Sequence, residues 1–399
     1  MTKLKLTDIA PYSGKRVQPF DGVKKYLSTG DLKDEGLGFE EVTYKSKPSR
    51  ADIIVSEGDI LFAKMVNTNK VLQIDKMLDG IIVSTGFSVH KPNENILHGN
   101  YLIQFFKNNY FLRQKNKLCT GAIQSAISNA GIEKIFIPVP SIIDQIQIAN
   151  ILSKAEKLIE QRKQSIAMLD EFLKNTFLEM FGDLTRNINK YPKGTIRDIV
   201  TEVKYGTSKP AEEEGKYPYL RMNNITTDGY WDLSKMKFIN IDDKEKEKCL
   251  VRKGDLLFNR TNSKELVGKT AVFNLNEEMI IAGYLIRVRF NEKANPYFVW
   301  GYLNSLHGKQ TLFGMCKTIV GMANINAQEL QNIKILIPQI ELQVQFANIV
   351  KKIEALKEEY KNSLLELENL YGGLSQLAFK GELKAEREGQ SITKEKVKL

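Results

Sequence analysis

The chain has 399 residues, 42% of them hydrophobic and 27% charged, and its formal net charge at pH 7 is +10. This composition is ordinary for a globular protein and excludes a collagen-like, disordered or disulfide-stapled chain. No apolar run reaches the ~20 residues of a membrane-spanning helix, and the first residues form no secretory signal. The three cysteines are far apart in the sequence and no pair has metal-ligand spacing, so we expect reduced thiols in the cytoplasm.

The excess positive charge lies in two blocks. Residues 1–140 carry 19 Lys and Arg against 14 Asp and Glu, and residues 184–338 carry 24 against 17. The segments 141–183 and 339–399 are slightly acidic and neutral. Two basic blocks are compatible with a polyanionic partner such as nucleic acid, although many domains that bind none carry as much charge.

Residues 1–140 predict a mixed α+β domain. Short apolar or alternating runs indicate strands in YLSTGDL (26–32), DILFAKM (59–65), GIIVSTGFSVH (80–90) and IEKIFIPVP (132–140). The pair Gly58–Asp59 is typical of a turn that leads into a strand. The aromatic stretch NYLIQFFKNNYFLRQ (100–114) predicts helix between the last two strands.

Residues 141–183 predict one long helix. Apolar residues recur every three or four positions, Pro138 and Pro140 precede the helix, and Gly182 stands where a C-cap glycine is expected. The predicted apolar seam of this helix consists of Ile151, Ala155, Leu158, Leu169 and Phe172.

The second half of the chain repeats the first. YLSTGDLKDEG at Tyr26 matches YLRMNNITTDG at Tyr219, EGDILFAK matches KGDLLFNR, and Pro140 matches Pro338. The repeat predicts a second mixed domain over 184–338, a second long helix over 339–383 and a charged tail over 384–399. A narrow apolar stripe is unstable alone in water, so we expect the two helices to pair as an antiparallel coiled coil. The second helix's seam residues are Ile349, Ile353, Leu356, Tyr360 and Leu367.

No residue pattern indicates catalysis. His90, His98 and His307 form no metal-binding motif, and Walker A and GxGxxG loops are absent. The string NPYF at Asn295 lacks the second proline of an amino-methyltransferase motif and indicates the start of a helix. The sequence therefore favours a binding protein that holds neither a metal nor a cofactor.

Polar loops next to the predicted strands provide candidate DNA contacts. Arg and Lys can donate to guanine, Asn can pair with adenine, and Lys and Arg more often contact phosphate. A duplicated reader on a helical spacer suits a DNA site in two parts. The candidate DNA-binding residues are Lys15, Arg16, Lys64, Asn67, Asn69, Lys70, Lys209, Arg221, Asn223, Asn224, Arg260, Asn262, Lys264 and Lys269.

The whole chain resembles the specificity subunits of type I restriction-modification systems. The resemblance rests on the paired YLxxx[DN][IL] and GD[IL]LF runs, on IPVPSIIDQIQIANIL and its counterpart IPQIELQVQFANIV, and on FLEMFGD (177–183) and LAFKGEL (377–383). It implies two target-recognition domains, 1–140 and 184–338, that each read half of a bipartite, asymmetric double-stranded DNA site. The helices 141–183 and 339–383 would set the unread spacer.

The resemblance also implies partners. The helices would dock two methyltransferase subunits, which bind S-adenosylmethionine and methylate adenine at N6. Restriction subunits, which bind ATP and Mg²⁺, would complete an endonuclease that defends against foreign DNA. Two alternatives remain open: a non-catalytic coiled-coil scaffold whose basic blocks are incidental, and the reading module of a fused restriction-methylation enzyme.

Overall fold

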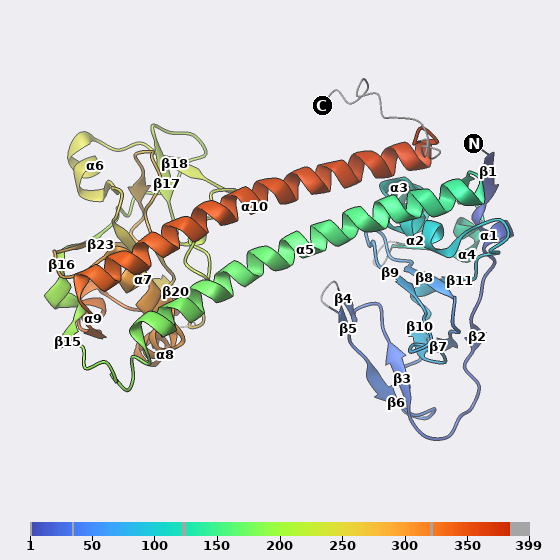
Figure 1. Ribbon diagram of the computed structural model, residues 1–399, viewed down its shortest axis with the longest axis horizontal. Helices are drawn as coiled ribbons and strands as arrows, with labels where there is room; N and C mark the ends of the chain where they lie inside the picture. The colour runs from blue at the N-terminus through green and yellow to red at the C-terminus, as the bar shows by residue number, and fades with distance from the viewer. Residues whose placement is uncertain (1, 34–35, 122–124, 320–321, 384–399) are drawn as a thin grey trace. The chain divides into compact units, whose positions relative to one another are not determined.

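The computed structural model describes residues 2–33, 36–121, 125–319 and 322–383, and the chain divides into two compact units (Figure 1). Unit 1 contains the chain up to Lys163 and again from Asn362, and unit 2 runs from Gln164 to Lys361. Each unit therefore combines one mixed domain with parts of both long helices. The predicted tail 384–399 lies outside the described residues, and the predicted domain limits stay predictions.

Unit 1 is built on two main sheets. The first has the order β2-β7-β10-β3-β6, and its strands β3 and β10 run parallel with Tyr26 opposite Ile82. The second is antiparallel with the order β11-β8-β9. The bounds are β1 Thr2–Lys5, β2 Lys15–Arg16, β3 Lys24–Leu27, β4 Leu32–Lys33, β5 Gly36–Leu37, β6 Glu40–Val42, β7 Ala51–Ile54, β8 Ile60–Ala63, β9 Val71–Gln73, β10 Ile82–Ser84, β11 Phe87–His90, β12 Cys119–Thr120, β13 Ala126–Ile127 and β14 Phe136–Val139.

Unit 2 repeats this topology. Its sheet β16-β23-β19-β21 corresponds to β11-β8-β9, and β17 pairs in parallel with β22 as β3 does with β10. The pair β15-β26 likewise corresponds to β1-β14. The bounds are β15 Lys193–Thr195, β16 Val200–Tyr205, β17 Tyr217–Leu220, β18 Lys237–Ile239, β19 Leu256–Asn259, β20 Thr261–Asn262, β21 Thr270–Val272, β22 Ile280–Ile281, β23 Leu285–Phe290, β24 Lys317–Ile319, β25 Met322–Asn324 and β26 Lys334–Leu336.

Each predicted aromatic helix is two helices in the structure. The break falls at Asn108 in unit 1 and at Ser305 in unit 2, both in extended backbone. Each side chain caps the following helix: Asn108 accepts from the Tyr110 N–H, and Ser305 accepts from the Gly308 N–H. The helices are α2 Gly99–Lys107, α3 Asn109–Lys117, α7 Pro296–Asn304 and α8 Leu306–Met315, with short helices α1 Leu6–Ile9, α4 Asn129–Ile132, α6 Asp243–Cys249 and α9 Ala327–Gln331.

The long helices are α5, Ile142–Phe181, and α10, Ile340–Lys380, drawn in green and orange-red in Figure 1. Gly182 and Gly381 follow them with φ of +72° and +82°, the left-handed C-cap that the sequence predicts. Within unit 1, Glu156 of α5 accepts from Tyr371, and Lys163 pairs with Glu368 at 3.2 Å. Contacts therefore move down α10 as they move up α5, so the helix segments run antiparallel. Among the described helices, none is long and apolar enough to cross a bilayer.

The predicted seam is wrong at three positions. Ile151, Leu158 and Phe172 are 36%, 51% and 52% exposed, whereas the neighbours Leu152 and Leu173 are buried. The reason is that α5 also packs on the domain of each unit, which turns the buried stripe by about one residue. Of the other predicted seam residues, Ala155 is buried, and the half-buried ones are Leu169, Ile349, Ile353, Leu356, Tyr360 and Leu367.

Aromatic side chains of the long helices pack against aromatic side chains of the domains. In unit 2, Phe181 of α5 lies 4.8 Å from Phe298 of α7, measured between ring centroids, and Phe177 lies 5.3 Å from Phe346 of α10. In unit 1, Phe379 of α10 lies 5.2 Å from Tyr101 of α2. Burying one such side chain contributes roughly 1.5–3 kcal/mol. Both helices thus belong to the core of each unit, and the mixed fold with two long helices is confirmed.

Candidate nucleic-acid interface

The loops 64–70 and 260–269 occupy equivalent places in the two units. The first joins β8 to β9 and the second joins β19 to β21, and each hairpin begins after a Gly-Asp turn. The turn aspartate accepts a backbone hydrogen bond of 2.8 Å in both units, Asp59 from the Ser56 N–H and Asp255 from the Arg252 N–H. The paired motif thus starts the same hairpin twice and presents a polar loop at its end.

In unit 1, two residues that the sequence predicts to contact DNA form hydrogen bonds with other residues of the protein. Asn67, with φ of +56°, exchanges two hydrogen bonds with Asn116: the Asn67 N–H donates to Oδ1 at 3.0 Å, and Asn116 Nδ2 donates back at 2.8 Å. Asn69 donates from Nδ2 to the Lys107 carbonyl at 2.8 Å. These amides therefore shape the loop, although both residues are exposed.

The basic candidates of unit 1 differ in how exposed their charged groups are and in how these groups are bonded within the protein. Lys70 donates from Nζ to the Thr29 carbonyl at 2.7 Å, and burial lowers the pKa of Lys64. Arg16 on β2 is exposed and pairs with Asp52 at 2.8 Å, and its neighbour Lys15 is also exposed. Lys15 and Arg16 therefore stand where a phosphate could reach them, on a different sheet from the hairpin loop.

In unit 2, Arg260 is held by an aromatic ring at the start of the loop. Its guanidinium carbon lies 4.8 Å from the centroid of Tyr205, and Nη1 lies 3.5 Å from the Gly283 carbonyl. The rings of Tyr205 and Tyr284 are 41% and 54% exposed. A guanidinium held over an exposed tyrosine ring can meet a base edge or a phosphate with less loss of side-chain freedom.

The two tyrosines were not among the predicted contacts. Tyr205 ends β16, and Tyr284 stands just before β23 on the same part of the sheet. Each adjoins a glycine, Gly206 or Gly283, and aromatic-glycine pairs at strand ends are the only sequence signal that could have found them. Their proximity to Arg260 comes from strand pairing, which residue spacing does not reveal.

The other loop candidates of unit 2 are partly engaged. Lys264 places Nζ 4.2 Å above the ring of Phe313, and Asn262 accepts from the Ser263 N–H at 2.9 Å. Lys269 is only 8% exposed and donates to the Met222 carbonyl at 2.8 Å. The Lys269 ammonium therefore holds a neighbouring turn, and its assignment to DNA binding stays a prediction.

The segment 221–224 is also largely structural. Asn224 is buried and cross-links the turn, accepting from the Arg221 N–H and donating to the Asp232 carbonyl, each at 2.9 Å. Its assignment as a DNA contact also stays a prediction. Arg221 donates to the Lys235 carbonyl at 2.8 Å, while Asn223 is exposed. Lys209, also a candidate, is exposed and forms a 2.5 Å ion pair with Glu245.

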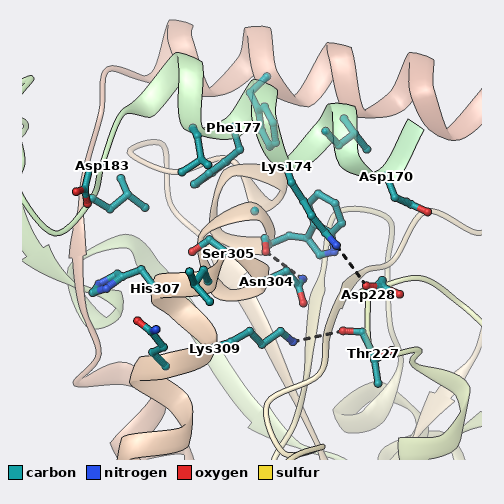
Figure 2. A pocket seen from close by; sticks show the side chains of 18 of the residues that line it. Asp170, Lys174, Phe177, Asp183, Thr227, Asp228, Asn304, Ser305, His307 and Lys309 are labelled. Atoms are coloured by element: carbon teal, nitrogen blue, oxygen red, sulfur yellow. Dashed lines mark hydrogen bonds and ion pairs between the residues drawn. The ribbon is translucent and has the colours of Figure 1, made fainter. Parts of the chain in front are cut away.

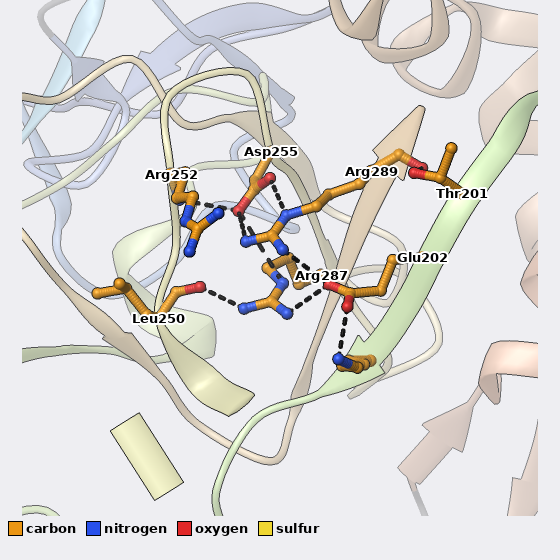
Figure 3. A network of polar contacts seen from close by, with 8 residues as sticks. Thr201, Glu202, Leu250, Arg252, Asp255, Arg287 and Arg289 are labelled. Carbon is orange, nitrogen blue, oxygen red and sulfur yellow. Dashed lines mark hydrogen bonds and ion pairs between the residues drawn. The ribbon is translucent and has the colours of Figure 1, made fainter. Parts of the chain in front are cut away.

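A partly buried network of ion pairs joins β16, β23 and the Gly-Asp turn before β19 (Figure 3). Arg287 on β23 pairs with Glu202 on β16 at 2.5 Å, and Arg289 pairs with Asp255 at 2.8 Å and with Glu202 at 3.0 Å. Burial raises the pKa of Glu202, but hydrogen bonds from Lys204 and Arg287 outweigh it and leave the pKa below its ordinary value. The network fixes the sheet from which Tyr205 and Arg260 project.

An apolar cavity of about 910 Å³ lies in unit 2 between α5, α7 and α8 (Figure 2). Its rim carries the Lys174–Asp228 pair at 3.8 Å and Lys309, whose pKa burial lowers to about 8. Its walls include Phe177, Trp300 and Leu306. Such a lining can bind an apolar side chain, and it presents no nucleophile paired with a base.

The described residues contain no group of three His, Cys, Asp or Glu placed to hold a metal ion. His90 is fully buried, with Nδ1 2.8 Å from the Ala10 carbonyl, and burial lowers its pKa to about 4. It is therefore a neutral core residue at ordinary pH. The geometry offers surfaces for binding, and its polar loops and stacked guanidinium suit a nucleic acid.

A comparison with known families gives one assignment that covers most of the chain. Residues 1–169 and 190–369 each match the family described as the type I restriction modification DNA specificity domain. The two matches follow the duplication seen in the sequence and in the strand topology.

Individual relatives and solved structures agree with this match. The EcoKI specificity subunit of Escherichia coli (strain K12) is 24% identical over 73% of this chain and 67% of its own length. The MjaVIII specificity subunit of Methanocaldococcus jannaschii is 24% identical over 92% and 88%. A chain from a study of complex assembly in the type I R-M system has a TM-score of 0.60 at 21% identity over 96% and 98%, and the S subunit from M. genitalium has 0.57 at 14% over 95% and 96%. At these identities the two structures show the fold alone.

Proposed function

This chain belongs to the family of type I restriction modification DNA specificity domains, and we propose that each of its units reads one half of a bipartite, asymmetric DNA site. The chain is then the specificity subunit of a type I restriction-modification complex. The observation that carries this proposal is the duplication: the same strand topology occurs twice, and each copy presents a polar hairpin loop at the same place.

The loops differ in side chains, which supports two different half-sites. Loop 64–70 is rich in asparagine amides held by Asn116 and Lys107, whereas loop 260–269 begins with the stacked Arg260. The two loops thus offer different side chains to DNA, so identical halves are not expected. The excess of basic residues in both blocks supports contact with the phosphates of double-stranded DNA.

The long helices support two further roles, as spacer and as docking surface. Both helices continue from one unit into the other, and a 40-residue helix is a stiff rod about 60 Å long. In both units these helices carry apolar side chains that the domains leave exposed. They include Ile143, Leu158, Leu365, Leu370 and Leu377 in unit 1, and Met168, Phe172, Leu178 and Val344 in unit 2. One such set per unit supports the docking of two methyltransferase subunits, one on each.

The chemistry then belongs to the partners. In this proposal the methyltransferase subunits bind S-adenosylmethionine and transfer its methyl group to N6 of adenine, and restriction subunits supply ATP- and Mg²⁺-dependent cleavage. The contribution of this chain is to position the partners on DNA through its loops and helices. It is not a catalyst itself.

The deciding experiment is co-expression of the chain with its neighbouring methyltransferase subunit, followed by single-molecule sequencing for N6-methyladenine in host DNA. We expect one bipartite motif, two short blocks around a gap of fixed length. A complex that assembles, leaves no such motif and binds DNA without sequence preference would instead be a scaffold. The salt dependence of binding then separates phosphate contact from base reading.

A further inference from the structure

We propose that Lys115 and Asn116 of α3 are positioning residues that fix the shape of loop 64–70 and thereby select the bases that unit 1 reads. The inference rests on the proposed DNA-reading function and deepens it for one half-site. Neither residue projects from the loop itself.

The ammonium of Lys115 is buried beneath the loop, with 1% of the residue exposed. It donates to the carbonyl oxygens of Ala63 at 3.1 Å and Met65 at 2.9 Å, to the Thr68 carbonyl, and to the Thr68 hydroxyl at 3.3 Å. Convergent carbonyl oxygens repel one another unless a cation or a donor lies between them. The chain therefore curls around this ammonium as it would around a bound cation.

The next residue holds the tip of the loop. Asn116 accepts from the backbone N–H of Asn67 at 3.0 Å and donates to the Asn67 side chain at 2.8 Å. Asn67 has φ of +56°, a left-handed conformation that asparagine adopts more readily than most residues. The two hydrogen bonds with Asn116 therefore hold a turn that the residue type at position 67 also favours.

The loop is held by hydrogen bonds from two sides: the α3 contacts hold its tip, and the start of the loop pairs with residues 125–127, with the Val66 N–H donating to the Ser125 carbonyl and the Ile127 N–H donating to the Lys64 carbonyl, each at 3.0 Å. Every residue from Lys64 to Lys70 is exposed or half-buried, whereas all four residues of the adjoining strand β8 are buried. Loss of the α3 contacts should thus change the shape of the loop at residues 65–68, while its two ends and the sheet below keep their contacts.

Unit 2 has a leucine at the place that corresponds to Lys115. Counting seven residues from the helix caps Asn108 and Ser305 leads to Lys115 in α3 and to Leu312 in α8. Leu312 is buried and lies within 2.7 Å of the position a Cβ on Gly268 would take. The second loop is therefore packed on a leucine rather than hydrogen-bonded to an ammonium, so the proposed effect is confined to one half-site.

The test compares Lys115→Met, Asn116→Ala and a control, Lys117→Met, in the complex with the methyltransferase subunit. Lys117 is exposed on the same helix, and Lys117→Met removes the same charge as Lys115→Met. The methylated motif of each complex is read from host DNA, and the amount of assembled complex is measured in parallel. We expect about a tenfold or greater loss of base discrimination in one half-site for Lys115→Met, with the other half-site and the Lys117→Met motif unchanged.

Asn116→Ala keeps the test decisive if Lys115→Met does not fold, since it removes only the bonds at the tip, and it should relax the same half-site more mildly. Complexes that form in reduced amount but methylate the original motif would show that Lys115 and Asn116 serve stability only and would overturn the inference. Relaxation of both half-sites would overturn it as well. Absence of a bipartite motif for the unsubstituted complex would contradict the proposed function itself.

Discussion

The charged side chain of Arg260 is held in one orientation by its neighbours. The ring of Tyr205 supports one face of its guanidinium at 4.8 Å, and its Nε is buried without a hydrogen-bond partner among the described residues. Orientation before binding lowers the entropy lost when the side chain meets a base. By contrast, Asn224 and Lys269 have the same hydrogen-bonding ability but spend it on neighbouring backbone.

Arg260→Ala should relax specificity at one position of the half-site read by unit 2. A bidentate contact to guanine is worth about 1–3 kcal/mol of discrimination, so binding to the preferred sequence should weaken by that amount. Binding of the assembled complex to a panel of single-base variants measures the effect, with Lys253→Ala at an exposed position as the control. Equal weakening on every sequence would identify a phosphate contact instead.

Arg287→Met should destabilise unit 2 by about 1–3 kcal/mol at pH 7, because Glu202 and Asp255 would lose one of the two arginines that pair with them and the Leu250 carbonyl would lose its donor. The pKa of Glu202 is lowered in the folded protein, so its stabilising contribution is present above its ordinary pKa of 4.5 and is lost as pH falls through the folded value. The cost of the substitution should therefore shrink in acid.

Tryptophan fluorescence during urea unfolding can measure this cost in unit 2 alone, because both tryptophans, Trp231 and Trp300, belong to that unit. Arg252→Met is the matched control, since the bond between residue 252 and Asp255 uses the backbone N–H. A cost that stays constant as pH is lowered from 7 to well below the folded pKa of Glu202 would show that Arg287 stabilises by packing rather than by charge.

At the scale of elements, some side chains of helix α5 are buried in the core and others are exposed. One face, with Leu173 and Phe177, is buried against the domain, and the other, with Phe172 and Leu178, is about half exposed. An α-helix turns 100° per residue, so adjacent positions lie on different faces. An exposed apolar stripe of this kind is typical of a surface that another subunit covers.

Neighbouring substitutions can separate the two faces. Leu173→Ala should cost about 2–5 kcal/mol of unfolding free energy, since it leaves a cavity in the unit 2 core. Phe172→Ala should change stability by less than about 0.5 kcal/mol but should weaken association with the methyltransferase subunit. Urea unfolding and analytical ultracentrifugation measure the two effects. Unchanged assembly in Phe172→Ala would remove that residue from the docking surface.

At the scale of the whole molecule, the chain is one unit built twice. Both units contain a parallel strand pair, a Gly-Asp hairpin and a pair of short helices with a polar cap between them. Each also takes its own share of α5 and α10 into its core. Units with separate cores can diverge in their loops without disturbing each other, which allows two specificities in one chain.

Replacement of residues 1–140 by the corresponding domain of a family member with a different target should change one half of the methylated motif and leave the other half and the gap as they are. The reason is that the loops of each unit are held by contacts within that unit. Sequencing of methylated host DNA gives the answer. A change in both halves would contradict independent reading.

The sequence by itself determined the duplication, the two long helices and their C-cap glycines, because repeats, apolar periodicity and caps are local patterns. It also placed both hairpin loops, since the Gly-Asp turn is a local signal that recurs in each half. It gave the residue types of those loops but could not tell an exposed amide from one that holds its own backbone.

The tertiary structure alone decided which polar side chains are free. Asn224 and Lys269 turned out to be buried supports, Tyr205 reached Arg260 through strand pairing, and Lys115 reached loop 64–70 from a helix some fifty residues away. It also decided which face of α5 is buried, because the helix packs on a domain as well as on its partner helix. These outcomes depend on contacts between residues distant in sequence, where local spacing carries no information.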